Sequence, residues 1–126
     1  MANTTATFAA TFDGLKSVLK KRAGKLKVLL DEPGHYSMAS KTIVWRGKPL
    51  WFGGVQVKKT YVSFHLMPVY MNPALLAKIS PELKKRMQGK SCFNFTAPDE
   101  KLFRELGKLA DAGLKFYATV KLPTEK

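Results

Sequence analysis

The stretch from Leu50 to Met67, LWFGGVQVKKTYVSFHLM, decides the fold of this chain. Two runs of alternating apolar residues flank Lys58-Lys59-Thr60, a pattern typical of two antiparallel strands joined by a short loop. The loop takes either residues 59–60 or residues 58–61, and both lengths put the same residues opposite one another. The predicted apolar pairs are Val57 with Val62, Val55 with Phe64, and Gly53 with Leu66. A shift of one residue would mix the two faces of the hairpin, so this register is predicted.

The other face of this hairpin mixes aromatic, polar and small residues. Its predicted members are Phe52, Gly54, Gln56, Tyr61, Ser63, His65 and Met67, joined by Cys92 and Asn94 from a strand predicted over 91–95. Gly54 lies opposite His65 in this register and leaves a space where a side chain would normally be. Apolar walls with a few polar groups are typical of pockets for a small ligand or a peptide. The alternative is that a helix covers this face and its polar groups pair with one another.

Outside the hairpin, the sequence predicts further strands and several helices. Apolar residues at helical spacing, including Phe8, Phe12 and Leu15, predict the first helix. Asn72 and Ser80 each precede a proline, which is typical of helix starts. The predicted elements are a helix over 5–22, strands over 25–32, 35–40 and 42–46, helices over 73–79 and 81–88, a strand over 91–95, and a helix that follows the capping box Thr96-Ala-Pro-Asp99 and ends at Gly113. A short helix is the alternative for 25–32. We therefore predict the α+β class: an antiparallel sheet of about five strands packed with an N-terminal helix, two short middle helices and a C-terminal helix.

The length of 126 residues predicts a single domain over 1–126, because two domains would each have too little core. Hydrophobic residues make up 45% of the chain, yet no apolar run approaches the roughly 20 residues that cross a bilayer. The N-terminus lacks the basic and apolar regions of a secretory signal. Cys92 is the only cysteine, which excludes an internal disulfide and suits a reducing cytoplasm. We expect a cytoplasmic domain whose tail, 121–126, is loosely held.

The chain is strongly basic, with 22 Lys and Arg against 9 Asp and Glu and a net charge of +13. Such a field favours an anionic partner but specifies neither a fold nor a reaction. The candidate anion-binding residues are Lys84, Lys85, Arg86 and Lys90. No helix-turn-helix, zinc-finger or RNA-binding motif accompanies them, so any nucleic-acid binding should be weak, independent of sequence and sensitive to salt. The alternative is that these cations only occupy helix ends and solvated faces.

Catalysis and metal binding have little support in the residues. Cys92 with His65 or His35 could supply a nucleophile and a base, but no recognisable nucleophile motif surrounds them. A lone cysteine in a phenylalanine-rich strand more often packs as a small apolar residue. The nine carboxylates are dispersed and the two histidines lie far apart in the sequence. We predict no catalytic residue, no metal and no cofactor.

Three segments resemble those of a known family: GKPLWFGGV at 47–55, YVSFHLMPVY at 61–70 and SPELKKRMQGKSCFNF at 80–95. They are similar to the YdhG-like family of small bacterial domains of unknown function, over residues 31–114. The resemblance implies an α+β domain with an antiparallel sheet packed against helices. One branch of that family is described as a frataxin-like iron chaperone, a role that calls for an acidic surface, whereas this chain carries a net charge of +13. The resemblance therefore implies a fold rather than an activity.

Together these features predict a small, non-catalytic binding domain of the bacterial cytoplasm. Its predicted partner is a small molecule or a peptide on the mixed face of the sheet, with His65 at the centre. One alternative is a weak, non-specific binder of nucleic acid or other anions, and another is an enzyme that uses Cys92 and His65. The sequence is also compatible with a homodimer.

Overall fold

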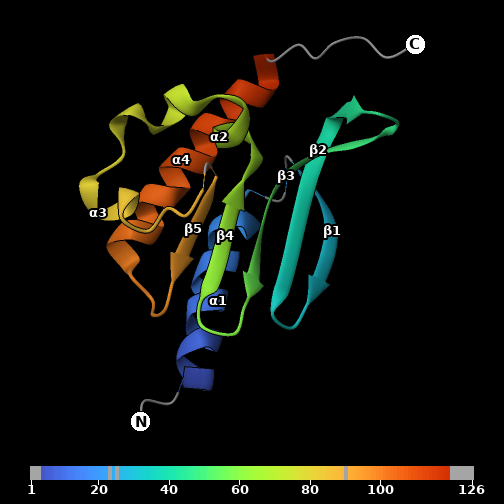
Figure 1. The fold of residues 1–126 in the computed structure, drawn as a ribbon. Coiled ribbons are helices and arrows are strands. Elements are labelled where there is room, and N and C mark those ends of the chain that lie inside the picture. Colours follow the sequence, from blue (N-terminus) through green and yellow to red (C-terminus); the bar gives the residue numbers. More distant parts are fainter. Residues whose placement is uncertain (1–3, 23, 25, 90, 120–126) are drawn as a thin grey trace.

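An antiparallel sheet with strand order β1-β2-β3-β4-β5 packs against helices (Figure 1). The structure is a computed structural model that describes residues 4–22, 24, 26–89 and 91–119. The elements are α1 (Thr4–Lys20), β1 (Leu26–Glu32), β2 (His35–Trp45), β3 (Lys48–Val57), β4 (Val62–Leu66), α2 (Met67–Met71), η2 (Pro73–Lys78), α3 (Pro81–Lys84), β5 (Cys92–Phe95) and α4 (Glu100–Thr119). The predicted α+β class, with helices at both ends and short helices in the middle, is confirmed.

The hairpin of β3 and β4 has the register predicted from its sequence. The paired residues are Val57 with Val62, Val55 with Phe64, and Gly53 with Leu66. The connection takes the longer of the two predicted lengths, residues 58–61, and the backbone N–H of Lys58 donates to the carbonyl of Tyr61 at its base. Val55, Phe64 and Leu66 are all buried. A slip of one residue would expose all of them, which is why the apolar face decides the register.

Side chains line up in rows that cross all five strands. The row toward the core is Asp31, Tyr36, Val55, Phe64 and Phe93. One row on the opposite face is Leu30, Ser37, Gly54, His65 and Cys92. A second row on that face is Glu32, His35, Gln56, Ser63 and Asn94. Successive rows point to opposite sides of the sheet because strand side chains alternate. We call the side of the last two rows the open face.

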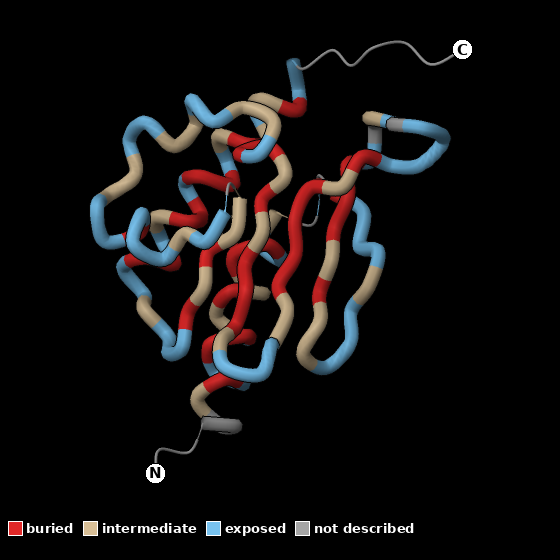
Figure 2. Tube along the Cα trace, in the orientation of Figure 1, coloured by how far each residue is buried: buried red, intermediate tan, exposed pale blue. Residues whose placement is uncertain are grey.

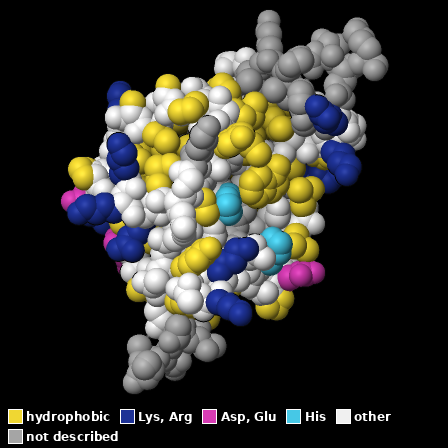
Figure 3. All heavy atoms as spheres, viewed as in Figure 1, with side chains coloured by type: hydrophobic (Ala, Val, Ile, Leu, Met, Phe, Trp, Pro, Cys, Tyr) yellow, Lys and Arg dark blue, Asp and Glu magenta, His cyan; other side chains and the backbone are white. Residues whose placement is uncertain are grey.

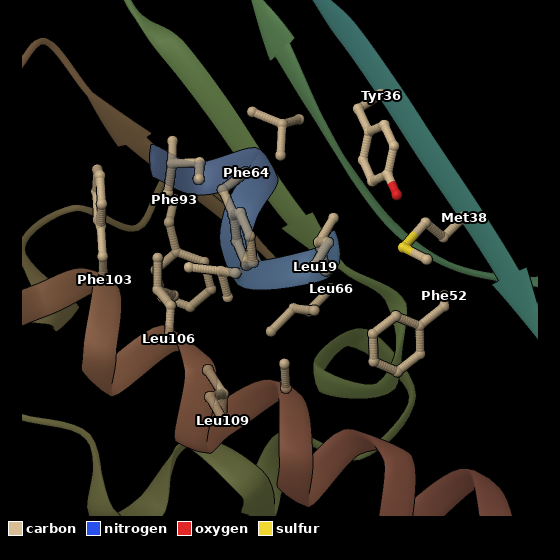
Figure 4. Close-up of a cluster of buried hydrophobic side chains, with 14 of the residues drawn as sticks. Leu19, Tyr36, Met38, Phe52, Phe64, Leu66, Phe93, Phe103, Leu106 and Leu109 are labelled. Carbon is tan, nitrogen blue, oxygen red and sulfur yellow. The ribbon is translucent and has the colours of Figure 1, made fainter. Parts of the chain in front are cut away.

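The core lies between the sheet and the helices α1 and α4, both on one side of the strands (Figures 1 and 2). Its largest fully buried side chains include Tyr36, Phe52, Phe64, Phe93, Phe95, Leu15, Leu19 and Leu106. Figure 4 shows how those from the sheet meet those from the helices. The guanidinium of Arg22, just after α1, links this helix to α4: it donates to Asp111 at 2.7 Å and to the carbonyl of Gly107 at 2.9 Å. No described helix packs on the open face.

The predicted position of Phe52 on the mixed face is wrong. The pairing of β2 with β3 shifts by one residue next to Phe52, which is a β-bulge. A bulge reverses the alternation of side chains beyond it, so Phe52 turns into the core and is 0% exposed (Figure 4). There it meets the ring of Tyr117 edge-on, with the ring centroids 5.5 Å apart. Trp51 takes the place of Phe52 on the open face.

The segment between β4 and β5 differs in part from its prediction. The helix α2 is not predicted at all, although Pro68 in its first turn is typical of a helix start. The predicted helix over 73–79 is the 3₁₀ helix η2, and the side chain of Asn72 makes no capping hydrogen bond. Ser80 caps α3 as predicted, because its hydroxyl accepts a hydrogen bond from the backbone N–H of Leu83. α3 ends at Lys84, short of the predicted end at 88.

Two further boundaries are corrected by the structure. β2 is continuous across the predicted break between strands 35–40 and 42–46. The carboxylate of Asp99 caps the helix α4 by accepting from the backbone N–H of Leu102, and the helix passes through the predicted stop at Gly113. Gly113 allows α4 to approach Pro68 closely, since a Cβ there would lie 3.0 Å from the proline ring. This glycine therefore serves packing rather than helix termination.

None of the described helices combines the length and the apolar character needed to cross a membrane. The tail predicted to be loosely held, 121–126, lies outside the described residues, and so does the first residue of the strand predicted over 25–32.

Candidate functional site

The open face of the sheet carries the predicted site. Figure 3 shows this surface with both histidine side chains visible, apolar side chains beside them, and Lys or Arg side chains close by. The pairing of β4 with β5 sets His65 beside Cys92 and Ser63 beside Asn94. The antiparallel register thus brings together His65 and Cys92, which are 27 positions apart in the sequence.

Trp51 is a residue of this site that the sequence pattern misses. The bulge turns its indole to the open face, where Nε1 donates a hydrogen bond to Oγ of Ser37 at 2.7 Å. A Cβ on Gly54 would lie 3.3 Å from Cζ2 of Trp51, so the indole occupies the space predicted above this glycine. Its ring centroid is 5.8 Å from that of His65, at an interplanar angle of 51°. The only sequence signal for this exchange is the Gly53-Gly54 pair, because glycine in a strand often marks a bulge.

Hydrogen bonds join the polar residues of the open face into one network, which we call the His65 network. Oγ of Ser63 lies 3.0 Å from Nε2 of His65 and 2.9 Å from Sγ of Cys92. Sγ of Cys92 lies 3.4 Å from Oδ1 of Asn94, whose amide donates to Oε1 of Gln88. The alternative to a pocket was that the polar groups pair with one another under a covering helix. The polar groups do pair with one another, but no described helix covers them.

The donors and acceptors of the His65 network fit one direction of hydrogen bonding. Oδ1 of Asn94 can only accept, so the thiol of Cys92 donates to it. The sulfur then accepts from the hydroxyl of Ser63, whose oxygen accepts in turn from Nε2 of His65. This direction of hydrogen bonding puts the proton of the neutral imidazole on Nε2 and leaves Nδ1 as its acceptor. In this arrangement Nε2, which also lies 3.5 Å from Sγ of Cys92, is a donor.

Burial holds the pKa of His65 below its ordinary value of 6.5, because desolvation disfavours the imidazolium ion. The positive charge of Lys58 lowers this pKa further. At neutral pH the ring is uncharged, which agrees with its place in the hydrogen-bond network.

We expect the protein to lose stability as the pH falls below about 6.5, through the lowered pKa of folded His65. The unfolded chain takes up the proton at a higher pH than the folded chain, so acid favours unfolding in this window. The free energy of unfolding, measured by urea titration between about pH 7.5 and pH 5.5, should fall less steeply in His65→Gln than in the parent. Equal slopes, or an imidazole that titrates above 6.5 in NMR spectra, would contradict this.

Other predicted site residues lie around this centre. Gln56 is partly buried and lies opposite Ser63 on the neighbouring strand. Tyr61 lies in the connection at the end of the hairpin, and Met67 begins α2 instead of extending β4. No hydrogen bond or ring contact between described residues joins Tyr61 or Met67 to His65. The prediction that Met67 lies on the sheet face is therefore wrong, because the strand ends one residue earlier.

The predicted anion-binding residues lie at the β5 edge of the sheet. Lys84 ends α3, Lys85 and Arg86 follow it, and all three are exposed. Arg86 lies over the ring of Phe95, 5.9 Å from its centroid, so packing accounts for part of its position. Lys90 lies outside the described residues. Weak, sequence-independent binding of anions here stays a prediction.

The part of the chain that the structure describes contains no cluster of metal ligands. No group of three or more His, Cys, Asp or Glu side chains there could hold a metal ion. The iron-chaperone role of one family branch therefore gains no support from these residues.

No protein-family model, curated protein or solved structure matches this chain. The resemblance to the YdhG-like family stays a prediction, and so does the role as a non-catalytic binding domain. The function proposed below therefore depends on the geometry of the open face alone.

Replacing Cys92 with serine should lower the free energy of unfolding by less than about 1 kcal/mol, since a hydroxyl can also accept from Ser63 and donate to Asn94. Cys92→Ala removes both hydrogen bonds and should cost more, about 1 to 2 kcal/mol. Urea unfolding of the two variants beside the parent measures the difference. An equal loss in both variants would show that the thiol contributes only volume.

Proposed function

We propose that this chain is a non-catalytic binding domain of the cytoplasm that holds a small ligand with a flat ring on the open face of the sheet. The position of Trp51 carries this proposal. Its indole rests over Gly54 and is tied to Ser37, so it is ordered before any ligand arrives. It is nevertheless only partly buried. An ordered, accessible aromatic ring offers a stacking surface at a low cost in entropy.

Polar groups around the indole support recognition of a nitrogen heterocycle. Nδ1 of His65 accepts no hydrogen bond from any described residue, and it is the basic nitrogen of the ring. Gln88 is exposed, and its amide N–H groups stay available because its oxygen accepts from Asn94. One acceptor and one donor beside an aromatic surface match the edge of a nucleobase or a nicotinamide ring. Lys58, whose charge acts on His65, would favour an anionic substituent on that ring.

Hydrogen bonding within the His65 network favours binding over catalysis by Cys92. A nucleophilic cysteine needs a thiolate and a neighbouring base. The thiol of Cys92 instead faces Oδ1 of Asn94 at 3.4 Å, an acceptor that would repel a thiolate. In the direction of hydrogen bonding described above, the nearest nitrogen of His65 donates to Ser63 and does not act as that base. These contacts support a ligand-binding role for the same residues.

Titration of the labelled protein with adenine and with nicotinamide, followed by ¹H–¹⁵N NMR, tests this proposal. We expect saturable shifts at Trp51 and His65, whereas cyclohexanol, which has no flat ring, should produce none. Trp51→Leu should weaken the binding roughly tenfold or more, because stacking on an aromatic side chain contributes about 1–3 kcal/mol. Tyr70→Leu removes a more exposed ring on α2 and should bind as the parent does. Equal binding by Trp51→Leu and the parent, or shifts confined to other residues, would refute the proposal.

A further inference from the structure

A cleft of about 1080 Å³ lies where α1 meets the ends of two hairpins, and Gln56, which pairs with Ser63, is part of its lining. In Figure 1 this is the lower end of the sheet, where the β1–β2 and β3–β4 turns lie close to α1. Its walls come from residues 8–16, 31–35 and 56–59. The volume matches the clefts that hold drug-sized ligands.

The floor of the cleft is apolar. Phe8 and Phe12 lie one helical turn apart on α1 and are 8% and 6% exposed, and Val57 lies at the end of β3. These side chains provide a surface for the apolar part of a ligand. Two phenylalanine rings can also attract a cation through their π-faces.

The charges around the cleft are unlike those of the rest of the chain. Asp13, Asp31 and Glu32 line it, which is three of the nine carboxylates of the sequence. Among the described residues, Lys16, Lys58 and Lys59 join them, so the formal charges of this lining cancel in a chain of net charge +13. A site for nucleic acid or phosphate would concentrate cations, and the carboxylates here would repel such ligands. A ligand with both charges fits better.

Positive and negative charges occupy different sides of the cleft. Nζ of Lys16 lies 2.7 Å from Oδ1 of Asp31, which neutralises this pair. The hydrogen bond to Asp31 raises the pKa of Lys16, and the nearby charge of Asp13 adds to the effect. The other two carboxylates of the lining are Asp13 on α1 and Glu32 at the end of β1. The remaining cations, Lys58 and Lys59, lie on the β3–β4 connection.

We propose that this cleft binds a small zwitterion with an apolar body, of the class of aromatic and branched amino acids. Its ammonium group lies on the side of Asp13 and Glu32, its carboxylate lies on the side of Lys58 and Lys59, and its side chain packs on Phe8 and Phe12. This site goes beyond the function proposed for the open face: it shares Lys58 with that face but uses neither Trp51 nor the ring of His65.

Three probes with the same ring and different charges test the proposal: L-phenylalanine, phenethylamine and 3-phenylpropionate. Calorimetry and ¹H–¹⁵N NMR on the full chain should show that phenylalanine binds at least tenfold more tightly than the other two. The NMR shifts should map to Phe12 and Val57 and leave Trp51 unchanged. The open-face proposal fails separately, if adenine and nicotinamide produce no shifts at Trp51 and His65. The failures of the two proposals can therefore be told apart.

Charge variants assign the two ends of the ligand. Asp13→Asn and Glu32→Gln should each weaken phenylalanine and phenethylamine severalfold and leave 3-phenylpropionate unchanged. Lys58→Met and Lys59→Met should weaken phenylalanine and 3-phenylpropionate and leave phenethylamine unchanged. Glu100→Gln and Lys108→Met are matched controls on α4, outside the cleft lining, and should bind all probes as the parent does. Equal affinity for the three probes, tightest binding of the anion, or no saturable binding of any probe would overturn the proposal.

Discussion

Replacing Gly54 with leucine should lower the free energy of unfolding by about 3 kcal/mol, the upper end of the usual cost of overpacking. A Cβ at this position would lie 2.7 Å from the carbonyl oxygen of Tyr36, a backbone atom that cannot move without disturbing β2. The same side chain would also displace the indole of Trp51. Thermal and urea unfolding of Gly54→Leu measure the loss.

Gly24→Ala is the matched control for this glycine. A Cβ there meets no atom within 4 Å, so the added methyl group should change stability by less than about 0.5 kcal/mol. If Gly54→Leu were as stable as Gly24→Ala, an empty space would lie above Gly54. The pocket inferred from sequence alone would then be restored, and the placement of Trp51 would be wrong.

Truncating Phe52 to alanine should cost about 4 kcal/mol, in the range typical of buried phenylalanine. The ring is 0% exposed, and it packs against Tyr117 of α4. The hydroxyl of Tyr117 also donates to the backbone carbonyl of Trp51, so α4 holds both residues of the bulge. The removal leaves a cavity at the contact between the sheet and α4.

Val44→Ala is a control on a neighbouring strand, where the side chain is 62% exposed, and it should cost less than about 1 kcal/mol. Strict alternation along β3 would reverse the roles of Phe52 and Trp51, with Trp51 buried and Phe52 on the surface. A small loss in Phe52→Ala together with a large loss in Trp51→Ala would therefore show that the bulge is absent. Urea unfolding of the three variants decides between the two arrangements.

Several features were determined by the sequence alone because their causes are local. The alternation of apolar residues in β3 and β4 sets the register, and with it the positions of Gly54, Ser63 and His65. The Ser80-Pro81 pair starts α3 because a hydroxyl cap and a proline both suit the first turn. The apolar stripes of α1 and α4 set the layer that covers one side of the sheet. Each of these signals lies within one element and its nearest neighbour along the chain.

Tertiary structure alone decided that Trp51, and not Phe52, joins the site. The bulge in β3 exchanges Phe52 and Trp51, because the ring of Phe52 packs against that of Tyr117 in the core. Figure 4 shows Phe52 among the buried side chains. Gly113 lies inside α4 because Pro68, far away in the sequence, fills the space beside it. The cleft beside Phe12 exists because two hairpin turns end next to α1. Contacts of this kind join residues that are distant in the chain, so periodicity, which reports only on near neighbours, contains no record of them.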